Sequence, residues 1–162
     1  MNEFVRVHQT LDPVYDRRSE ILILGSFPSV VSREKHFYYA NSTNRFWPVM
    51  ECLFNETIAD RREFCLRHHI ALWDVIESCT IAGSSDSTIR DVTANDIEHL
   101  IQNSSVHTVF TTGAKAAALY RKYVRASLPA VPLPSTSAAN ANMRLDDLVK
   151  EYRCVKEALE KN

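Results

Sequence analysis

The chain alternates between short apolar segments and stretches with helical spacing. Three segments, 21–24 (ILIL), 70–76 (IALWDVI) and 106–111 (VHTVFT), are dominated by aliphatic and β-branched residues, and 130–133 (AVPL) is a shorter and weaker fourth. Runs of this kind, without strict alternation, are typical of strands that are buried on both faces of a parallel sheet. Strands that alternate with helices indicate an α/β fold with helices on both faces of the sheet.

Apolar residues at helical spacing predict the helices between these strands. The expected helices cover 46–54 with Pro48 in the first turn, 59–68, 93–103, 113–124 and 145–159. For the third of them, Thr93 followed by Asp96 predicts an N-cap with an acidic third position. The 162 residues contain no linker, repeat or low-complexity tract, so we expect a single domain over 1–162.

The composition argues against several classes of protein. With 45% hydrophobic and 24% charged residues the chain can bury a packed core, so disorder is not expected. No apolar run approaches the roughly 18 residues of a membrane span, and the start, MNEFVRVHQT, lacks a signal-peptide pattern, so we expect a cytoplasmic protein without a membrane partner. The net charge of −1 gives no general attraction to nucleic acid, although basic clusters in 61–69 and 121–125 leave a local basic face open.

The cysteines and histidines do not predict a metal site. The four cysteines are widely spaced without a C-x-x-C pair, and no H-x-x-x-H or H-E-x-x-H occurs. We therefore expect no metal and no cofactor, and we interpret the cysteines as buried thiols in a reducing compartment. A G-x-S-x-G turn is also absent, which argues against Ser-His-Asp catalysis.

The segment 25–44, which follows the first predicted strand, combines aromatic rings with hydroxyl and amide groups. Phe27, Tyr38 and Tyr39 lie among serines and asparagines. Rings beside directional polar groups suit a pocket for a planar heterocycle. A structural loop that uses the same rings for packing is the alternative interpretation.

Two later loops carry features of phosphate sites. In 111–120, Gly113 opens a helix after a strand and Lys115 lies in its first turn, but the spacing is not that of a nucleotide P-loop. In 131–143, hydroxyl and backbone N–H groups precede the last helix and can hold a phosphate, although a capped helix start after a Pro-fixed turn explains this segment equally well. Because the carboxyl ends of parallel strands share one edge, we expect both loops to meet the segment 25–44 there.

Three motifs together resemble those of a known family. LILGSFPS (22–29), FYYAN (37–41) with NRFW (44–47), and LPSTSAAN (133–140) resemble the motif set of the uracil-DNA glycosylase superfamily, and are most similar to its hypoxanthine-DNA glycosylase branch. ALWDVI, GSSDSTI and TTGAKA lie between the outer motifs, in the order of that branch. The resemblance covers roughly residues 11–160.

The resemblance implies a fold, a reaction and a partner. The fold would be a three-layer α/β/α sandwich around a short four-stranded parallel sheet in the order 2-1-3-4. The reaction would be hydrolysis of the N-glycosidic bond of a deaminated base, hypoxanthine and also uracil, flipped out of DNA. Water would be the nucleophile, because no lysine lies in the motifs as a Schiff-base former; Lys35 and Lys115 are the nearest. The partner would be DNA, bound by a monomer.

The chain departs from the superfamily at two motif positions, and this shifts the expected catalytic role. Many members carry Asp or Asn where this chain has Phe27, and His where it has Leu133. Asn41 is therefore the first choice for positioning the attacking water. Asn44 is the second choice, unless it caps the helix that begins near Arg45.

The remaining site residues are implied by the same resemblance. Those expected to bind the base are Gly25, Ser26, Phe27, Pro28, Ser29, Phe37, Tyr38 and Tyr39, together with Asp74 and Asp86. The acceptor for a ring N–H is Asp74 or Asp86, unless either caps a turn; the backbone groups of Ser26 and Phe27 are the alternative. Those expected to bind DNA are Lys115, Ser135, Thr136, Ser137 and Asn140. Two alternatives stay open from the sequence: a catalytically inactive nucleic-acid-binding module of the same fold, and a nucleoside hydrolase.

Overall fold

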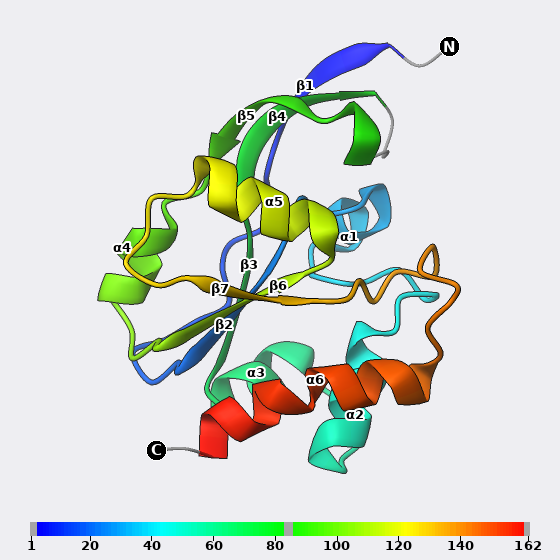
Figure 1. The fold of residues 1–162 in the computed structure, drawn as a ribbon, viewed down its shortest axis with the longest axis vertical. Helices are drawn as coiled ribbons and strands as arrows, with labels where there is room; N and C mark the ends of the chain where they lie inside the picture. Colours follow the sequence, from blue (N-terminus) through cyan, green and yellow to red (C-terminus); the bar gives the residue numbers. More distant parts are fainter. Residues whose placement is uncertain (1–2, 83–85, 161–162) are drawn as a thin grey trace.

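The computed structural model describes residues 3–82 and 86–160, and its centre is a four-stranded parallel sheet (Figure 1). The strands are β2 (Ile21–Gly25), β3 (Ile70–Asp74), β6 (Thr108–Thr112) and β7 (Ala130–Leu133), in the spatial order β3-β2-β6-β7. Numbered among themselves, the four parallel strands have the order 2-1-3-4. The labels of the whole chain differ because β1, β4 and β5 form a second sheet.

Both faces of the parallel sheet are buried, as its aliphatic strands predict. Along β2, Ile21 and Ile23 belong to one hydrophobic core, whereas Leu22 and Leu24 belong to a second core on the opposite face. All four side chains are fully buried. The sheet is therefore the middle of three layers, and the predicted α/β class is confirmed.

One outer layer consists of α2 (Phe46–Phe54), α3 (Arg61–Arg67) and α6 (Leu145–Glu160). Pro48 falls in the first turn of α2, where its missing N–H removes no helical hydrogen bond. Met50, fully buried, lies on the apolar stripe that α2 turns toward the core. The helical spacing of the sequence thus predicts this layer correctly.

The other outer layer combines two helices with a second sheet, which is antiparallel. The helices are α4 (Ile97–Gln102) and α5 (Ala114–Tyr123), and the sheet has the order β1-β4-β5, with β1 (Phe4–His8), β4 (Ile76–Ala82) and β5 (Arg90–Ala94). A single-turn 3-10 helix, Asp86–Thr88, precedes β5. The sequence analysis does not predict this sheet, because its first strand, FVRVH, is short and largely exposed.

The single strand predicted over 70–76 is wrong, because the structure divides this segment at Val75. The N–H of Val75 donates to the carbonyl of Gly25 at 2.9 Å, and the carbonyl of Val75 accepts from the N–H of Asn95 at 2.8 Å. The first bond still joins the chain to β2, whereas the second joins it to Asn95 just after β5, so the chain passes here from the parallel sheet into β4 of the other sheet. Asp74 is consequently the last residue of β3.

The predicted N-cap at Thr93 is also wrong. Thr93 lies in β5, opposite Ser78 of β4. Asp96 caps α4 instead, since its side chain accepts from the N–H of His99 at 3.1 Å. An Asp at the N-cap satisfies a free helical N–H and suits the helix dipole, so the acidic residue begins the helix rather than following its cap.

The cysteines are only partly as expected. Cys65 and Cys79 are buried thiols, whereas Cys52 is exposed on α2 and Cys154 is half-buried on α6. Across the described residues, no helix has the length and apolarity needed to cross a membrane.

The core between the sheet and α6 can be tested by truncation. Leu148 is fully buried on α6, so Leu148→Ala should lower the free energy of unfolding by about 2–5 kcal/mol through lost burial and a residual cavity. Lys150→Ala, at an exposed position of the same helix, should change it by no more than about 0.5 kcal/mol. Urea denaturation of both variants makes the measurement, and equal effects would contradict this packing.

Candidate active site

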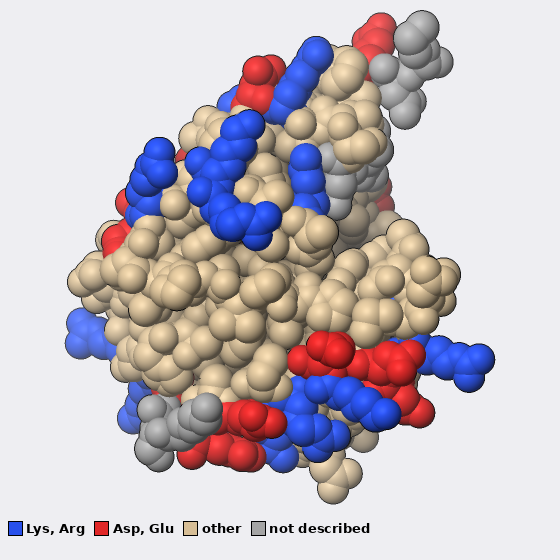
Figure 2. All heavy atoms as spheres, viewed as in Figure 1, with Lys and Arg blue, Asp and Glu red and all other residues tan. Residues whose placement is uncertain are grey.

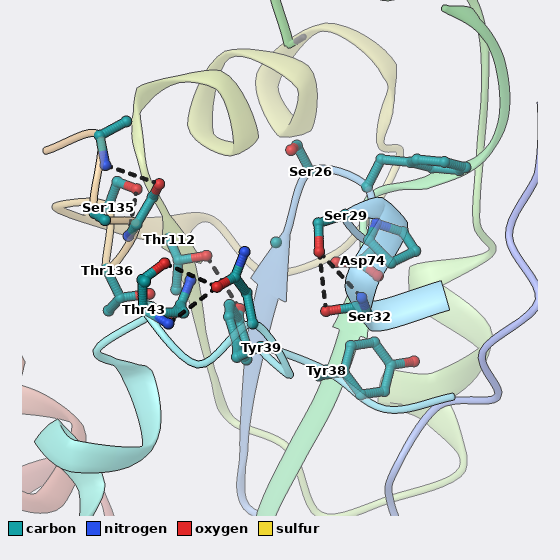
Figure 3. A pocket seen from close by; sticks show the side chains of 18 of the residues that line it. Ser26, Ser29, Ser32, Tyr38, Tyr39, Thr43, Asp74, Thr112, Ser135 and Thr136 are labelled. Atoms are coloured by element: carbon teal, nitrogen blue, oxygen red, sulfur yellow. Dashed lines mark hydrogen bonds between the residues drawn. The ribbon is translucent and has the colours of Figure 1, made fainter. Parts of the chain in front are cut away.

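A pocket of about 440 Å³ lies where three strands of the parallel sheet end (Figure 3). Gly25 ends β2, Asp74 ends β3 and Thr112 ends β6, and all three line the pocket. The segment after β2 and the segment 135–139 after β7 form its walls. The loops expected to meet at this edge of the sheet therefore do so, apart from Lys115. The volume accommodates a purine or pyrimidine base.

At the floor of the pocket, a carboxyl group approaches the backbone of Gly25 closely. Gly25 and Asp74 are direct neighbours in the parallel register of β2 and β3. A Cβ atom at position 25 would lie 2.6 Å from Asp74 Oδ1, 3.4 Å from the Tyr39 hydroxyl and 3.8 Å from Thr112 Oγ1. Three side-chain oxygens thus converge on the space that glycine leaves free, and the hydroxyls of Tyr39 and Thr112 are themselves 3.1 Å apart.

Asp74 is the one carboxyl among the described residues that line the pocket. Asp74 is only 4% exposed, and burial raises the pKa of its carboxyl to about 7. One oxygen, Oδ2, accepts a hydrogen bond from Gln9 Nε2 at 2.9 Å. A carboxyl group with a pKa near neutrality in a pocket is a common feature of a functional site.

The aromatic residues of the segment 25–44 divide between pocket and core. Tyr39 has a left-handed backbone (φ 53°), stacks on Phe46 at 4.0 Å and directs its hydroxyl to the pocket floor. Tyr38 also lines the pocket, and its hydroxyl donates to the carbonyl of Asp12 at 2.8 Å. Phe37 does not appear among the described lining residues; its ring stacks on that of Trp47 with the centroids 5.9 Å apart, so it packs against the core instead of the expected base.

A short helix, α1 (Val30–Lys35), carries part of the opposite wall. It begins at Ser29, whose hydroxyl accepts from the N–H of Ser32 at 3.1 Å. The predicted residues Ser26, Phe27, Pro28 and Ser29 all line the pocket. Arg33 of α1 lines it too, with its guanidinium 5.4 Å from the centre of the Phe27 ring. Arg33 was not among the residues predicted to line the pocket, although it lies within the segment 25–44 that was predicted to form it.

The two asparagines chosen for catalysis both line the pocket, but they differ in their hydrogen bonds. Asn41 Oδ1 accepts from the N–H and the hydroxyl of Thr43, at 2.9 and 2.8 Å. Its amide NH₂ makes no hydrogen bond to the described residues. Asn44 Oδ1 accepts from the N–H of Phe46, the first residue of α2, at 2.9 Å; Asn44 lies one residue before the N-cap, Arg45, and satisfies a free N–H at the helix start from there.

The last motif forms a second wall through its backbone turns. Ser135, Thr136 and Ser137 line the pocket, with Thr136 buried. The hydroxyl of Ser135 accepts from the N–H of Ser137 at 3.1 Å, and that of Ser137 accepts from the N–H of Ala139 at 3.2 Å. Asn140 is not among the described lining residues; its amide donates to the carbonyl of Ser135 at 3.0 Å and braces the loop.

Arg45, in the second motif, connects that motif to the last one, a role that its sequence position alone does not indicate. Its guanidinium donates to the carbonyls of Ser137 at 2.9 Å, Asn140 at 3.0 Å and Met143. Its backbone N–H donates to the carbonyl of Thr136 at 3.0 Å. One side chain thus holds three backbone carbonyls of the segment 137–143, as the several donors of a guanidinium allow.

Two further predicted residues do not appear among the described residues that line the pocket. Lys115 is half-buried in the first turn of α5 and is absent from the described lining, so it can contact DNA only beyond the pocket. The side chain of Asp86 lies outside the described residues, as do 83–85 of the GSSDSTI motif. Ser32, Thr43 and Thr112 line the pocket without having been selected.

Charged side chains lie near the site, but the described residues form no metal-binding group. Figure 2 shows Lys and Arg side chains gathered over α5 in the upper half of this face, and both signs mixed along α6 below. Within 3–82 and 86–160, no three His, Cys, Asp or Glu side chains are placed to hold a metal ion. The site is thus a pocket of hydroxyls, amides, one buried carboxyl and aromatic rings at the edge of a parallel sheet.

The comparison with protein families identifies the class of protein that has this site. The model of the "Uracil DNA glycosylase superfamily" matches residues 13–161, nearly the whole chain. The chain belongs to the uracil DNA glycosylase superfamily.

Three similar proteins come from Methanosarcina. A hypoxanthine DNA glycosylase of Methanosarcina acetivorans is 35% identical over 133 residues, which cover 78% of this chain and 84% of that protein. A hypoxanthine DNA glycosylase of Methanosarcina barkeri is 37% identical over 97 residues, 57% of this chain and 61% of that protein, so this match spans about three fifths of its length. A solution NMR structure from Methanosarcina acetivorans, described as a candidate uracil DNA glycosylase, has a TM-score of 0.77 and 30% identity, with 96% of this chain and 99% of that chain covered.

The close approach at Gly25 predicts a coupling with Asp74. Gly25→Ala should lower the free energy of unfolding by about 1–3 kcal/mol, because the added Cβ lies 2.6 Å from Asp74 Oδ1 and forces the carboxyl to move. In an Asp74→Ala background the same change should cost much less, since the clashing oxygen is gone. Denaturation of the two single variants and the double variant measures the coupling; additive effects would contradict the geometry.

Proposed function

We propose that this DNA glycosylase excises hypoxanthine, and uracil more weakly, from DNA. The observation that supports it most is the buried carboxyl of Asp74 at the floor of a base-sized pocket, beside the hydroxyls of Tyr39 and Thr112. The names of the two Methanosarcina relatives support the same substrate.

The polar edge of the base explains the selectivity. Hypoxanthine presents an N–H donor at N1 beside the O6 acceptor, and uracil presents the same pair at N3 and O4. Ionised Asp74 accepts the ring N–H, and a hydroxyl or backbone N–H at the floor donates to the carbonyl oxygen. Adenine and cytosine present a ring acceptor in place of the N–H, and an acceptor facing a buried carboxylate is costly.

The reaction is a hydrolysis in which water replaces the base. The N-glycosidic bond breaks, the base leaves with the bonding electrons, and the sugar becomes oxocarbenium-like. Water then adds to C1′, and its proton is transferred to the departing base, which gives an abasic site and free hypoxanthine. Asn41, with an NH₂ that makes no hydrogen bond to the described residues, orients the water or the developing anion. No lysine occurs among the described lining residues, which supports the assignment as a monofunctional enzyme.

DNA would lie across the mouth of the pocket. Ser135, Thr136 and Ser137 back the flipped base, and Lys115 at the start of α5 meets a phosphate beyond it. Further basic side chains lie over α5, the helix whose first turn carries Lys115 (Figure 2). With a net charge of −1, the protein depends on such local contacts rather than on long-range attraction.

An inosine duplex tests the proposal directly. The protein is incubated with a duplex that carries a single deoxyinosine, and alkali then cleaves the abasic product. Strand cleavage after alkali, and none before it, is expected. Binding without cleavage would favour an inactive binding module, and hydrolysis of free deoxyinosine with no action on the duplex would favour a nucleoside hydrolase.

The two asparagines should separate chemistry from stability. Asn41→Ala should lower the single-turnover rate by about 100-fold, on the scale of one lost transition-state hydrogen bond, with little change in DNA binding. Asn44→Ala should chiefly lower the free energy of unfolding, by about 1 kcal/mol, because Phe46 N–H loses its partner. Rates at saturating protein and urea midpoints are the measurements, and the reverse pattern would exchange the two roles.

The DNA contact of Lys115 should appear in the salt dependence of binding. Lys115→Ala should weaken binding of lesion duplex and reduce the slope of log affinity against log salt by about one phosphate contact. Lys156→Ala is the matched control: this lysine lines a surface hollow with Glu20, which precedes β2, at the opposite end of the sheet. Equal slopes for the wild type and Lys115→Ala would remove Lys115 from the DNA-binding surface.

A further inference from the structure

Gln9 connects the antiparallel sheet to the pocket floor. It follows β1, and its N–H donates to the carbonyl of Glu77 in β4 at 2.6 Å, which extends the pairing of the two strands by one residue. Its side chain then crosses to the parallel sheet, where Nε2 donates to Asp74 Oδ2 at 2.9 Å. The antiparallel sheet therefore positions an amide beside the carboxyl of the site.

The orientation of this amide is fixed by a second contact. The N–H of Leu11 donates to Gln9 Oε1 at 2.6 Å. A backbone N–H is a donor only, so the atom that faces Leu11 must be the amide oxygen, and the NH₂ must face Asp74. A flipped amide would place two donors together at Leu11 and two acceptors together at Asp74.

Because Gln9 donates to Oδ2, the two oxygens of Asp74 differ in their hydrogen bonds. Oδ2 already accepts from Gln9, so a proton on Asp74 would reside on Oδ1. Oδ1 accepts no hydrogen bond from the described residues and lies beside Gly25 at the pocket floor. The atom that meets the base is therefore an acceptor when Asp74 is ionised and a donor when it is neutral.

Several titratable or charged groups lie around Asp74, but among the described residues only Gln9 donates a hydrogen bond to its carboxyl. Tyr38 and Tyr39 face the carboxyl, and burial raises the pKa of both hydroxyls well above the usual value, so they stay neutral. The Tyr38 hydroxyl also faces Gln9 and, beyond it, Asp12. Arg33 lines the same pocket from α1.

We propose that Gln9 is a positioning residue that acts through Asp74 to keep undamaged adenine out of the reaction. By donating to Oδ2 it favours the ionised carboxyl, and it leaves Oδ1 as an acceptor for the N1–H of hypoxanthine. Adenine has an acceptor at N1, so an anionic Oδ1 repels it, whereas a neutral Asp74 would donate to it. The consequence for excision rests on the proposed function; the control of Asp74 by Gln9 does not.

Gln9→Met removes the donor at similar length, and Gln9→Glu keeps the shape but forces two carboxyl groups to share a proton. In Gln9→Met the titration midpoint of Asp74 should rise by about one pH unit, on the scale of one lost hydrogen bond to a carboxylate. In Gln9→Glu the two carboxyls titrate as a pair, and the upper midpoint of the pair should lie above that of Asp74 in the wild type. The measurement is ¹³C-carboxyl NMR of the free protein, with Asp74→Asn to assign the resonance and amide spectra to confirm the fold. Gln102→Met, at an exposed position at the end of α4, should leave the midpoint unchanged.

Excision is measured in parallel, as single-turnover rates on duplexes that carry hypoxanthine or adenine. For a midpoint that moves from about 7 to about 8, the neutral fraction of Asp74 at pH 8 rises about fivefold, and the ratio of adenine to hypoxanthine excision should rise with it. The same ratio in wild type should rise as the pH falls through 7.

Each outcome decides between the two proposals. An unchanged midpoint in both Gln9 variants overturns the role of Gln9, whatever the activity. A raised midpoint with an unchanged excision ratio overturns the link to specificity. A raised midpoint in a protein whose wild type excises no hypoxanthine upholds the control of Asp74 by Gln9 and overturns the proposed function alone.

Discussion

The contact between the carboxyl of Asp74 and the backbone of Gly25 is the constraint on which the site depends. In the parallel register of β2 and β3 these residues are opposite each other at the end of both strands. A Cβ at position 25 would lie 2.6 Å from Asp74 Oδ1, so any residue other than glycine would displace the carboxyl. The absent side chain is what allows Asp74, Tyr39 and Thr112 to converge on one space.

The antiparallel sheet helps to hold Asp74 in this position. The chain leaves β3 at Val75 and enters β4, and β1 pairs with β4 so that Gln9 reaches back to Asp74. Asn95, just after β5, donates through its side chain to the carbonyl of Asp74 at 2.9 Å and to that of Ile76 at 3.3 Å. Contacts from this sheet thus hold both the backbone and the carboxyl of one residue.

The sequence predicts the parts of the structure that are encoded locally. Strands of aliphatic residues, helices with apolar stripes and the pocket segment 25–44 all follow from patterns within a few residues. The break at Val75 and the roles of Gln9 and Arg45 depend on partners far apart in the chain: Gln9 lies 65 residues from Asp74, and Arg45 lies 92 residues from Ser137. Such pairings leave no periodic trace in one sequence, so pattern analysis cannot find them.

The charges in the pocket fit a reaction in which little proton removal is needed early. Of the described lining residues, Asp74 is the one carboxyl and Arg33 the one side chain with a fixed positive charge. A transition state that separates an oxocarbenium-like sugar from an anionic base needs oriented dipoles more than a strong base. Hydroxyls and amides supply such dipoles. On the proposed function, the buried carboxyl of Asp74, with a pKa of about 7, distinguishes bases by their hydrogen-bonding edge rather than serving as a base catalyst.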